Sequence, residues 1–213
     1  MDNLEHQIFY RRHLPHYQPP GATLFITFRL AESIPEAVIL QLREESARIE
    51  AALRNVSDQT ERQRQLELSS RRMFGRWDKH LDCMKTGYLR DPRIASIVAE
   101  SMSCRDQEIY NLYAFCIMPN HVHLVCQPIE NKSGSFYTLS EIMHSLKRYT
   151  ARRANQILGR EGQFWQHESY DHVVRDEGEL DRIINYVIEN PVKAGLVKHW
   201  RDWEWTYCKY DFQ

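Results

Sequence analysis

The sequence predicts an α+β fold: a ferredoxin-like antiparallel sheet of split βαβ order, with a further helix appended near the C-terminus. Segments typical of strands and helices follow one another as strand, helical region, strand, strand, helix, strand and helix. A length of 213 residues suits one domain with an ordinary core. A composition of 42% hydrophobic and 27% charged residues is that of a soluble globular protein. We therefore expect residues 1–213 to form a single domain.

The first strand and a long helical elaboration occupy the N-terminal half. The run "GATLFITFRL" at 21–30 is rich in Phe, Ile and Thr and begins after a proline-rich turn, so it predicts a strand. Pro35 suits the first turn of a helix. Residues 36–103 then show helical spacing of apolar residues with long polar stretches, which predicts a helical insertion between the first two strands. A scaffold or a lid is the expected role of this insertion.

The remaining elements follow in short succession. Residues 108–118 and 122–128 predict a hairpin, turned by Pro119 and Asn120. Residues 138–158 predict an amphipathic helix, a strand is expected around 164–174, and the last helix begins near Glu177. The tail 198–213 alternates Trp203, Trp205 and Tyr207, which indicates a strand edge or a packed C-terminal cap.

Composition excludes several classes of protein. No apolar run approaches the roughly 20 residues of a membrane span, and the N-terminus has no apolar signal core, so we expect a cytoplasmic protein with no membrane partner. The cysteines are odd in number and contain no C-x-x-C pair, which indicates reduced thiols; they are Cys83, Cys104, Cys116, Cys126 and Cys208.

Positive charge is concentrated in one segment of a chain whose formal net charge is -1. The run "KRYTARRANQILGR" at 147–160 contains no acidic residue and carries Lys147, Arg148, Arg152, Arg153 and Arg160. Such a patch can contact a nucleic-acid backbone, although a helix face that is merely solvated has the same composition.

Two histidines stand out in "MPNHVHLVC", residues 118–126. Side chains alternate along a strand, so His121 and His123 point to the same face and can reach one metal ion. Ordinary surface or hydrogen-bonded histidines are the alternative, since the pair alone is a weak signal. A metal site would need a third ligand from another element.

The last helix, in "GELDRIINYVIENPVKAGLV", offers that ligand. Its buried stripe consists of Leu180, Ile183, Ile184, Val187 and Ile188, at i, i+3, i+4, i+7 and i+8. Tyr186 and Asn190 lie one turn apart on the flank of this stripe, and Arg182 precedes them by one turn. Each also has a structural interpretation: Asn190 as a helix stop before Pro191, Tyr186 as a half-exposed aromatic, Arg182 as the partner of a surface acid.

A phosphodiester reaction would use these residue types together. A tyrosine that attacks a phosphate must lose its phenolic proton, and the phosphate needs its charge withdrawn. A hard divalent ion held by two imidazoles and one amide oxygen keeps positions open for phosphate and water. A nearby arginine can stabilise the developing negative charge.

Three motifs in this chain resemble a known family. "MPNHVHLV", "GQFWQHESYDHVVRDEGEL" and "YVIENPVKAGLV" closely resemble those of the single-tyrosine HUH transposases, most of all the REP-associated tyrosine transposases. The resemblance implies a metal-dependent, site-specific endonuclease and strand transferase, a transposase that cleaves single-stranded DNA beside a hairpin through a 5′-phosphotyrosine intermediate.

The resemblance also implies roles for individual residues. His121 and His123 match the metal-binding pair, Tyr186 the nucleophile and Asn190 the third ligand, with Mg²⁺ or Mn²⁺ as the ion. The expected partner is a single-stranded DNA hairpin formed by a REP-like palindrome, contacted by the basic helix and by Arg182. A homodimer is needed if the tyrosine helix swaps across chains. The long segment 36–103 departs from compact members of the family and leaves the DNA-binding surface open.

Two other functions fit parts of the sequence. A non-catalytic nucleic-acid-binding module is a common use of ferredoxin-like sheets, and it would not need His, His, Tyr and Asn together. A small metallohydrolase that uses bound hydroxide would need another strong ligand and would not need Tyr186.

Overall fold

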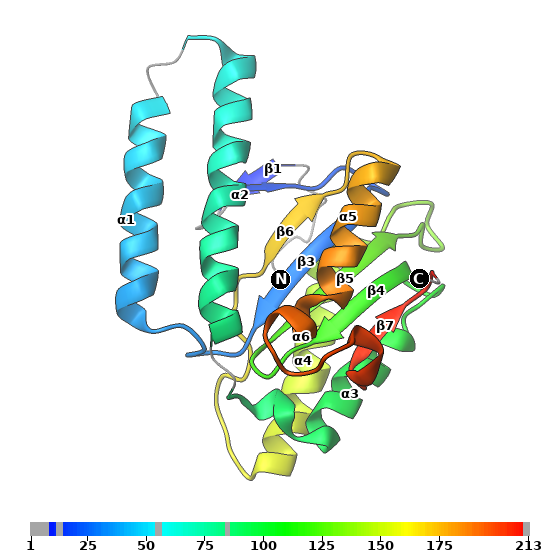
Figure 1. Cartoon of the computed structure of the whole chain (residues 1–213). Helices are drawn as coiled ribbons and strands as arrows, with labels where there is room; N and C mark the ends of the chain where they lie inside the picture. The colour runs from blue at the N-terminus through cyan, green and yellow to red at the C-terminus, as the bar shows by residue number, and fades with distance from the viewer. Residues whose placement is uncertain (1–8, 12–14, 54–56, 84–85, 211–213) are drawn as a thin grey trace.

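A five-stranded antiparallel sheet forms the centre of the protein (Figure 1). The computed structural model describes residues 9–11, 15–53, 57–83 and 86–210. The strands lie in the order β6-β3-β5-β4-β7, where β3 is Leu24–Arg29, β4 is Tyr110–Ile117, β5 is His121–Pro128, β6 is Tyr170–Val173 and β7 is Thr206–Cys208. The predicted α+β class and the antiparallel sheet are confirmed, and β5 is the central strand.

Helices cover both faces of this sheet. Helices α3 (Pro92–Ser103) and α4 (Leu139–Leu158) pack on one face, where the core is formed by side chains such as Phe28, Leu112, Val122, Leu124 and Leu146. Helix α5 (Glu177–Ile188) packs on the other face through Ile184, Val187 and Ile188. Alternation along β5 sends Val122 and Leu124 to the first face and therefore sends His121 and His123 to the second.

Local sequence signals fix where α4 begins and ends. Thr138 and Glu141 form a reciprocal capping box, which satisfies two backbone N–H groups of the first turn. Gly159 ends the helix in the left-handed conformation, at φ 61°, where a side chain is disfavoured.

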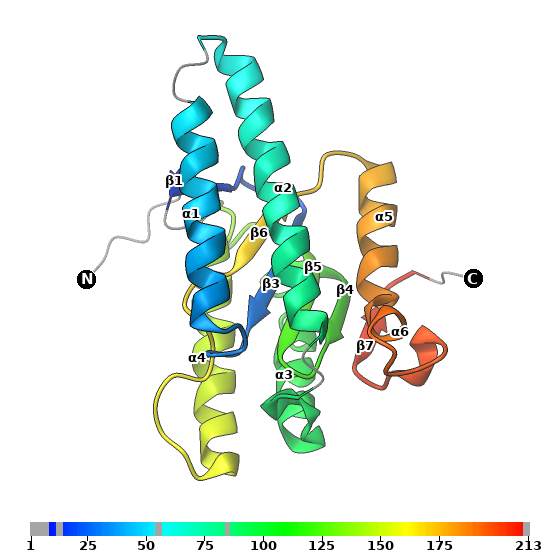
Figure 2. The same cartoon turned by 60° about the vertical axis from the view of Figure 1, so that its left-hand side comes forward.

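The segment between β3 and β4 contains a pair of long helices, α1 (Glu36–Leu53) and α2 (Gln59–Cys83), followed by the short helix η1 (Tyr88–Arg90) and α3. Figures 1 and 2 show α1 and α2 side by side, with α2 nearer to the sheet on the face that carries α5. Phe74 of α2 stacks on Tyr170 of β6 with ring centroids 3.9 Å apart, and it packs edge-on against Phe25 of β3. The expected helical insertion therefore lies against the sheet through its second helix.

Several details differ from the sequence expectation. The strand expected around 164–174 is limited to β6, because Trp165 makes only an isolated bridge to Leu30 and its ring is buried against Phe28. The N-terminal pair β1 (Phe9–Arg11) and β2 (Pro15–Tyr17) was not expected.

In the C-terminal tail, η2 (Trp200–Asp202) packs near α6 (Asn190–Lys193), and β7 is an edge strand beside β4 that includes Tyr207 but neither Trp203 nor Trp205. Positions 211–213 of this tail, and 1–8 and 12–14 at the N-terminus, lie outside the described residues. Among the helices that the structure describes, none is long and apolar enough to cross a membrane.

Candidate metal and tyrosine site

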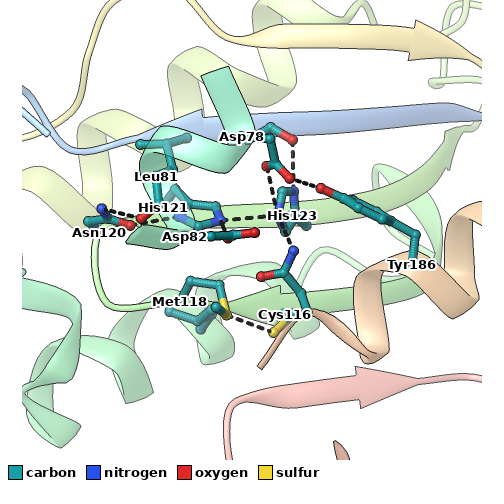
Figure 3. A network of polar contacts seen from close by, with 12 residues as sticks. Asp78, Leu81, Asp82, Cys116, Met118, Asn120, His121, His123 and Tyr186 are labelled. Carbon is teal, nitrogen blue, oxygen red and sulfur yellow. Dashed lines mark hydrogen bonds and ion pairs between the residues drawn. The ribbon is translucent and has the colours of Figure 1, made fainter. Parts of the chain in front are cut away.

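The histidine pair lies in the middle of the sheet, on the face covered by α5 and α2 (Figure 3). His121 and His123 are both completely buried, and their Nε2 atoms are 3.1 Å apart. Opposite them on β3 are Arg29 and Thr27. The side chains of His121 and His123 therefore come together on one face of β5, the central strand.

Asn120 determines which nitrogen of His121 carries the proton. The Asn120 amide nitrogen donates to the Leu81 carbonyl at 3.0 Å, so the amide oxygen faces His121 Nδ1 at 2.6 Å and accepts its proton. The Nε2 lone pair of a neutral His121 is consequently directed at the centre of the site. This is the tautomer that a metal ligand requires.

His123 has a similar arrangement on its outer nitrogen. Its Nδ1 lies 2.8 Å from the Thr27 hydroxyl. Its Nε2 faces His121 and accepts from the Asn190 amide nitrogen, which is 3.2 Å away. Burial lowers the pKa of His121 to about 3 and holds the pKa of His123 well below its ordinary range. Both rings are therefore neutral near pH 7 and available as ligands.

Helix α2 brings two carboxyl groups to the histidines. Asp78 Oδ1 is 3.5 Å from His123 Nε2, and Asp82 Oδ1 is 3.7 Å from His121 Nε2. These contacts are not ion pairs, because both imidazoles are neutral. Burial, aided by the Asp82 charge, raises the pKa of Asp78 to about 8, and burial raises that of Asp82 to about 6; Lys193 opposes both shifts.

Asn190 and Tyr186 complete the group from the C-terminal helices. Asn190 begins the short helix α6 and is completely buried. Tyr186 of α5 is half-buried, its ring centroid is 5.5 Å from that of His123, and its hydroxyl donates to Asp78 Oδ2. Figure 3 shows the Asp78 carboxyl between His123 and Tyr186.

The donor set fits a divalent metal ion. Asp78 Oδ1, Asp82 Oδ1 and Asn190 Oδ1 are buried and have no hydrogen-bond partner among the described residues. Buried acceptors without partners are costly, and a cation among them would satisfy all three. Asp78, His121 and His123 offer ligand atoms that lie within 4.8 Å of one another, so this buried group could bind a metal ion.

The predicted site residues fall into two sets in space. The histidine pair, Tyr186 and Asn190 come together within one chain. Arg182 is exposed on α5, one turn before the tyrosine. Helix α4, with Arg148, Arg152 and Arg153 exposed, covers the opposite face of the sheet, so the structure does not bring these arginines to the histidines.

Lys147, also on α4, makes hydrogen bonds to the segment 166–169, which follows Trp165. Its ammonium donates to the Gln166 carbonyl at 2.8 Å, the His167 carbonyl at 3.0 Å and the Ser169 hydroxyl at 2.7 Å. Lys147 and Arg148 line a groove of about 410 Å³ between α4 and residues 162–169.

Sequence reasoning missed Asp78, Asp82 and Lys193. The two acids are one turn apart on α2, and Asp78 is adjacent to the helix's buried apolar positions, Met73, Leu81 and half-buried Trp77. An acid on the apolar stripe of a polar helix was the available signal. Lys193 Nζ lies 4.6 Å from the centroid of the Tyr186 ring, so a cation that the sequence analysis did not name lies beside this tyrosine.

Comparison with known proteins shows which family and which relatives this chain resembles. The family described as "Transposase IS200 like" matches residues 86–190, a segment that includes both histidines, Tyr186 and Asn190 and begins after α2. A protein of Haemophilus influenzae named "Putative REP-associated tyrosine transposase" is 28% identical over 102 residues, which are 46% of this chain and 58% of that protein. An uncharacterized protein of the same organism is 28% identical over 98 residues, 37% of this chain and 52% of its own length. The chain thus spans little more than half the length of these curated relatives.

A solved structure has the same fold. The structure of a REP-associated tyrosine transposase bound to a REP hairpin superimposes with a TM-score of 0.51 at 16% sequence identity, over 92% of this chain and 80% of that one. At this identity the likeness shows a shared fold. Residues 86–190 match the family described as "Transposase IS200 like", and this match confirms the resemblance read from the three motifs.

Proposed function

We propose that this protein is a metal-dependent, site-specific single-stranded DNA endonuclease and strand transferase. In this proposal it acts beside hairpin DNA formed by a REP-like palindrome, and Tyr186 forms a 5′-phosphotyrosine intermediate. The ferredoxin-like core supplies the metal ligands and α5 supplies the nucleophile.

One observation carries the proposal. The hydroxyl of Tyr186 is hydrogen bonded to a carboxylate whose other oxygen faces the paired histidines. A tyrosine that served only to pack α5 against the sheet would have no need of a buried carboxylate beside two neutral imidazoles. Two histidines, a carboxylate and an amide oxygen are suitable ligands for Mn²⁺ or Mg²⁺.

Each residue then has a defined task. His121, His123, Asn190 and Asp78 would hold the ion, which when bound withdraws charge from the scissile phosphate and orients it. The Tyr186 oxygen bonds to phosphorus as its proton leaves toward the hydrogen-bonded carboxylate. The bond from phosphorus to the 3′ oxygen breaks, that oxygen takes up a proton, and the 3′-hydroxyl is released. In strand transfer a 3′-hydroxyl reverses these steps and frees the tyrosine.

The DNA-binding assignment is also a proposal. Arg148, Arg152 and Arg153 form the exposed basic face of α4, and Arg182 lies beside the tyrosine on α5. A hairpin bound to α4 would have to send its single-stranded flank around the β6 edge of the sheet to reach the site. Lys147 would act there by holding residues 166–169 in place rather than by direct contact alone.

The test is the formation of a covalent adduct. The protein is incubated with a single-stranded oligonucleotide that carries a hairpin and flanking bases, with Mn²⁺, with Mg²⁺ or with EDTA. We expect a protein–DNA adduct that survives denaturation, requires the metal, and is absent from Tyr186→Phe. Tyr113→Phe, a partly buried tyrosine on β4, is the matched control and should form the adduct normally.

Other outcomes favour the competing functions. An equal yield of adduct from Tyr186→Phe would remove the assigned nucleophile. Cleavage without any covalent product would favour a metallohydrolase. Binding of the hairpin without cleavage, in the presence of either metal, would favour a non-catalytic nucleic-acid-binding module.

A further inference from the structure

We propose that Asp78 is a bridging carboxylate, with Oδ1 as a metal ligand and Oδ2 as the group that positions the Tyr186 hydroxyl. This inference rests on the proposed function and deepens it, because it makes the insertion helix α2 part of the catalytic centre. The segment that matches the transposase family begins after this helix.

The two oxygens of the Asp78 carboxyl group have different surroundings. Oδ2 accepts the hydrogen bond of the Tyr186 hydroxyl. Oδ1 is buried without a hydrogen-bond partner and lies 3.5 Å from His123 Nε2, whose lone pair faces the same space. A carboxylate can bind a cation through one oxygen while the other accepts a hydrogen bond. Oδ1 of Asp78 therefore faces the space where a metal ion would bind, and Oδ2 faces the Tyr186 hydroxyl.

The position of α2 is fixed by contacts along its length. Near the middle of the helix, Arg71 donates to Glu179 of α5 at 2.8 Å, in a contact shared with His172 of β6. Toward its end, the Leu81 carbonyl accepts from Asn120, the residue that orients His121. Asp78 lies between these two attachments, so its carboxyl group is held in place from both sides.

The bridge has a chemical consequence for the nucleophile. Tyr186 comes from α5 and the histidines come from β5, and the Asp78 carboxyl group contacts both. An ion bound at Oδ1 would hold Asp78 in its present rotamer. In this rotamer Asp78 accepts the hydrogen bond of the Tyr186 hydroxyl, and the centroids of the Tyr186 and His123 rings are 5.5 Å apart. Positioning of this kind lowers the orientational cost of attack on phosphorus.

Asp82 is an internal comparison for the bridge. It lies one turn further along α2, its Oδ1 is also buried without a partner, and it is 3.7 Å from His121 Nε2. None of its described contacts reaches Tyr186. Asp82 can therefore support the ion, whereas Asp78, of these two carboxyl groups, is the one that can join the ion to the tyrosine.

The experiment measures metal affinity and adduct formation in the full chain. Mn²⁺ is titrated calorimetrically into wild type, Asp78→Asn, Asp82→Asn, His123→Ala and, as control, Glu61→Gln at the far end of α2. We expect His123→Ala and Asp78→Asn to lose at least about tenfold in Mn²⁺ affinity, Asp82→Asn to lose less, and Glu61→Gln to match wild type. Circular dichroism and thermal unfolding establish that each variant is folded.

The rate of adduct formation at saturating Mn²⁺ separates positioning from ligation. High Mn²⁺ should restore the rate of Asp82→Asn toward wild type and should leave Asp78→Asn slow. Asp78→Glu, which keeps the charge and displaces it by one methylene, should bind Mn²⁺ better than Asp78→Asn and still form the adduct slowly. It also serves if Asp78→Asn does not fold.

The possible failures are distinguishable. Wild-type Mn²⁺ affinity in Asp78→Asn, combined with a loss in His123→Ala, would overturn the bridge and leave the histidine site intact. Restoration of the Asp78→Asn rate by high Mn²⁺ would also overturn it, because ligation alone would then explain the variant. No Mn²⁺ binding by wild type, or none that depends on His123, would overturn the proposed metal-dependent function itself.

Discussion

The two faces of the sheet are built from the same strands but have opposite chemistry. The face under α3 and α4 is packed with apolar side chains, and its buried Trp165 indole donates to Thr150, whose hydroxyl donates to the Leu146 carbonyl. The face under α5 and α2 buries two histidines, two carboxyl groups and an amide within contact of one another. On the first face, the Trp165 indole and the Thr150 hydroxyl each have a hydrogen-bond partner.

On the second face, polar atoms remain without partners. Oxygens of Asp78, Asp82 and Asn190 are buried without a hydrogen-bond partner among the described residues. Their side chains lie beside two imidazole nitrogens 3.1 Å apart, an arrangement that a folded protein would not retain for stability alone. The first face thus stabilises the fold, while the second buries a polar group that could bind a metal ion. Substitutions on the first face should therefore lower the unfolding free energy, and substitutions on the second face should lower the affinity for Mn²⁺.

The largest effect on stability is expected from the apolar face. Leu146→Ala removes a completely buried side chain between α4 and the sheet. It should cost about 2–5 kcal/mol of unfolding free energy, because the cavity cannot be filled by neighbours already packed against the sheet. Chemical denaturation measures the loss. Mn²⁺ affinity of the folded variant should stay at the wild-type value; a large drop would mean that the two faces are not independent.

A smaller effect is expected from the residue that orients His121. Asn120→Ala leaves every proposed ligand in place but removes the acceptor of the Nδ1 proton. Loss of such an orienting group typically reduces metal affinity 10–100-fold. Calorimetric titration with Mn²⁺ tests this, with Asn131→Ala, a half-buried residue of the loop after β5, as the matched control. Equal affinities in the two variants would contradict the assignment of Asn120.

These two faces also differ in how far the sequence could predict them. Strict alternation in β5 and the 3.6-residue stripe of α5 placed His121, His123 and Tyr186 on the correct flanks, because periodicity reports which side of an element faces the core. It says nothing about which distant helix packs on that side.

The contribution of α2 therefore escaped prediction. Asp78 is separated from His123 by 45 positions, which include η1, α3 and β4, and its role depends on how α2 docks on the sheet. The Asn120 turn was predicted, but the link between its side chain and Leu81 required the same docking. Likewise, the arginines of α4 could be placed on an exposed helix, while the covering of the opposite face by that helix is a property of the tertiary fold.

The pH dependence of stability offers a further test of the polar face. Burial raises the pKa of Asp78 to about 8 from an ordinary 3.8, so in metal-free protein the fold binds this proton more tightly than the unfolded chain does. The unfolding free energy should therefore fall as pH rises from about 6.5 to about 8. Below about 6.5 the buried neutral histidines have the opposite effect, because the unfolded chain takes up their protons.

Denaturation in EDTA across this pH window measures the slope. Asp78→Asn should flatten it, and Asp91→Asn, at the N-cap of α3, should leave it unchanged. Saturating Mn²⁺ should also abolish the fall, because the ion replaces the proton. A wild-type slope in Asp78→Asn would assign the titration to another group.

The smallest effect is expected on the basic face of α4, which lies on the apolar side of the sheet. Arg152→Gln removes one exposed charge without touching the core. If α4 contacts the hairpin backbone, the slope of log affinity against log salt should decrease by about 1, and the loss should be similar for different hairpin sequences. Arg48→Gln on α1 is the matched control. An unchanged slope in Arg152→Gln would leave α4 a solvated face and direct the search for the hairpin to the face that carries Tyr186.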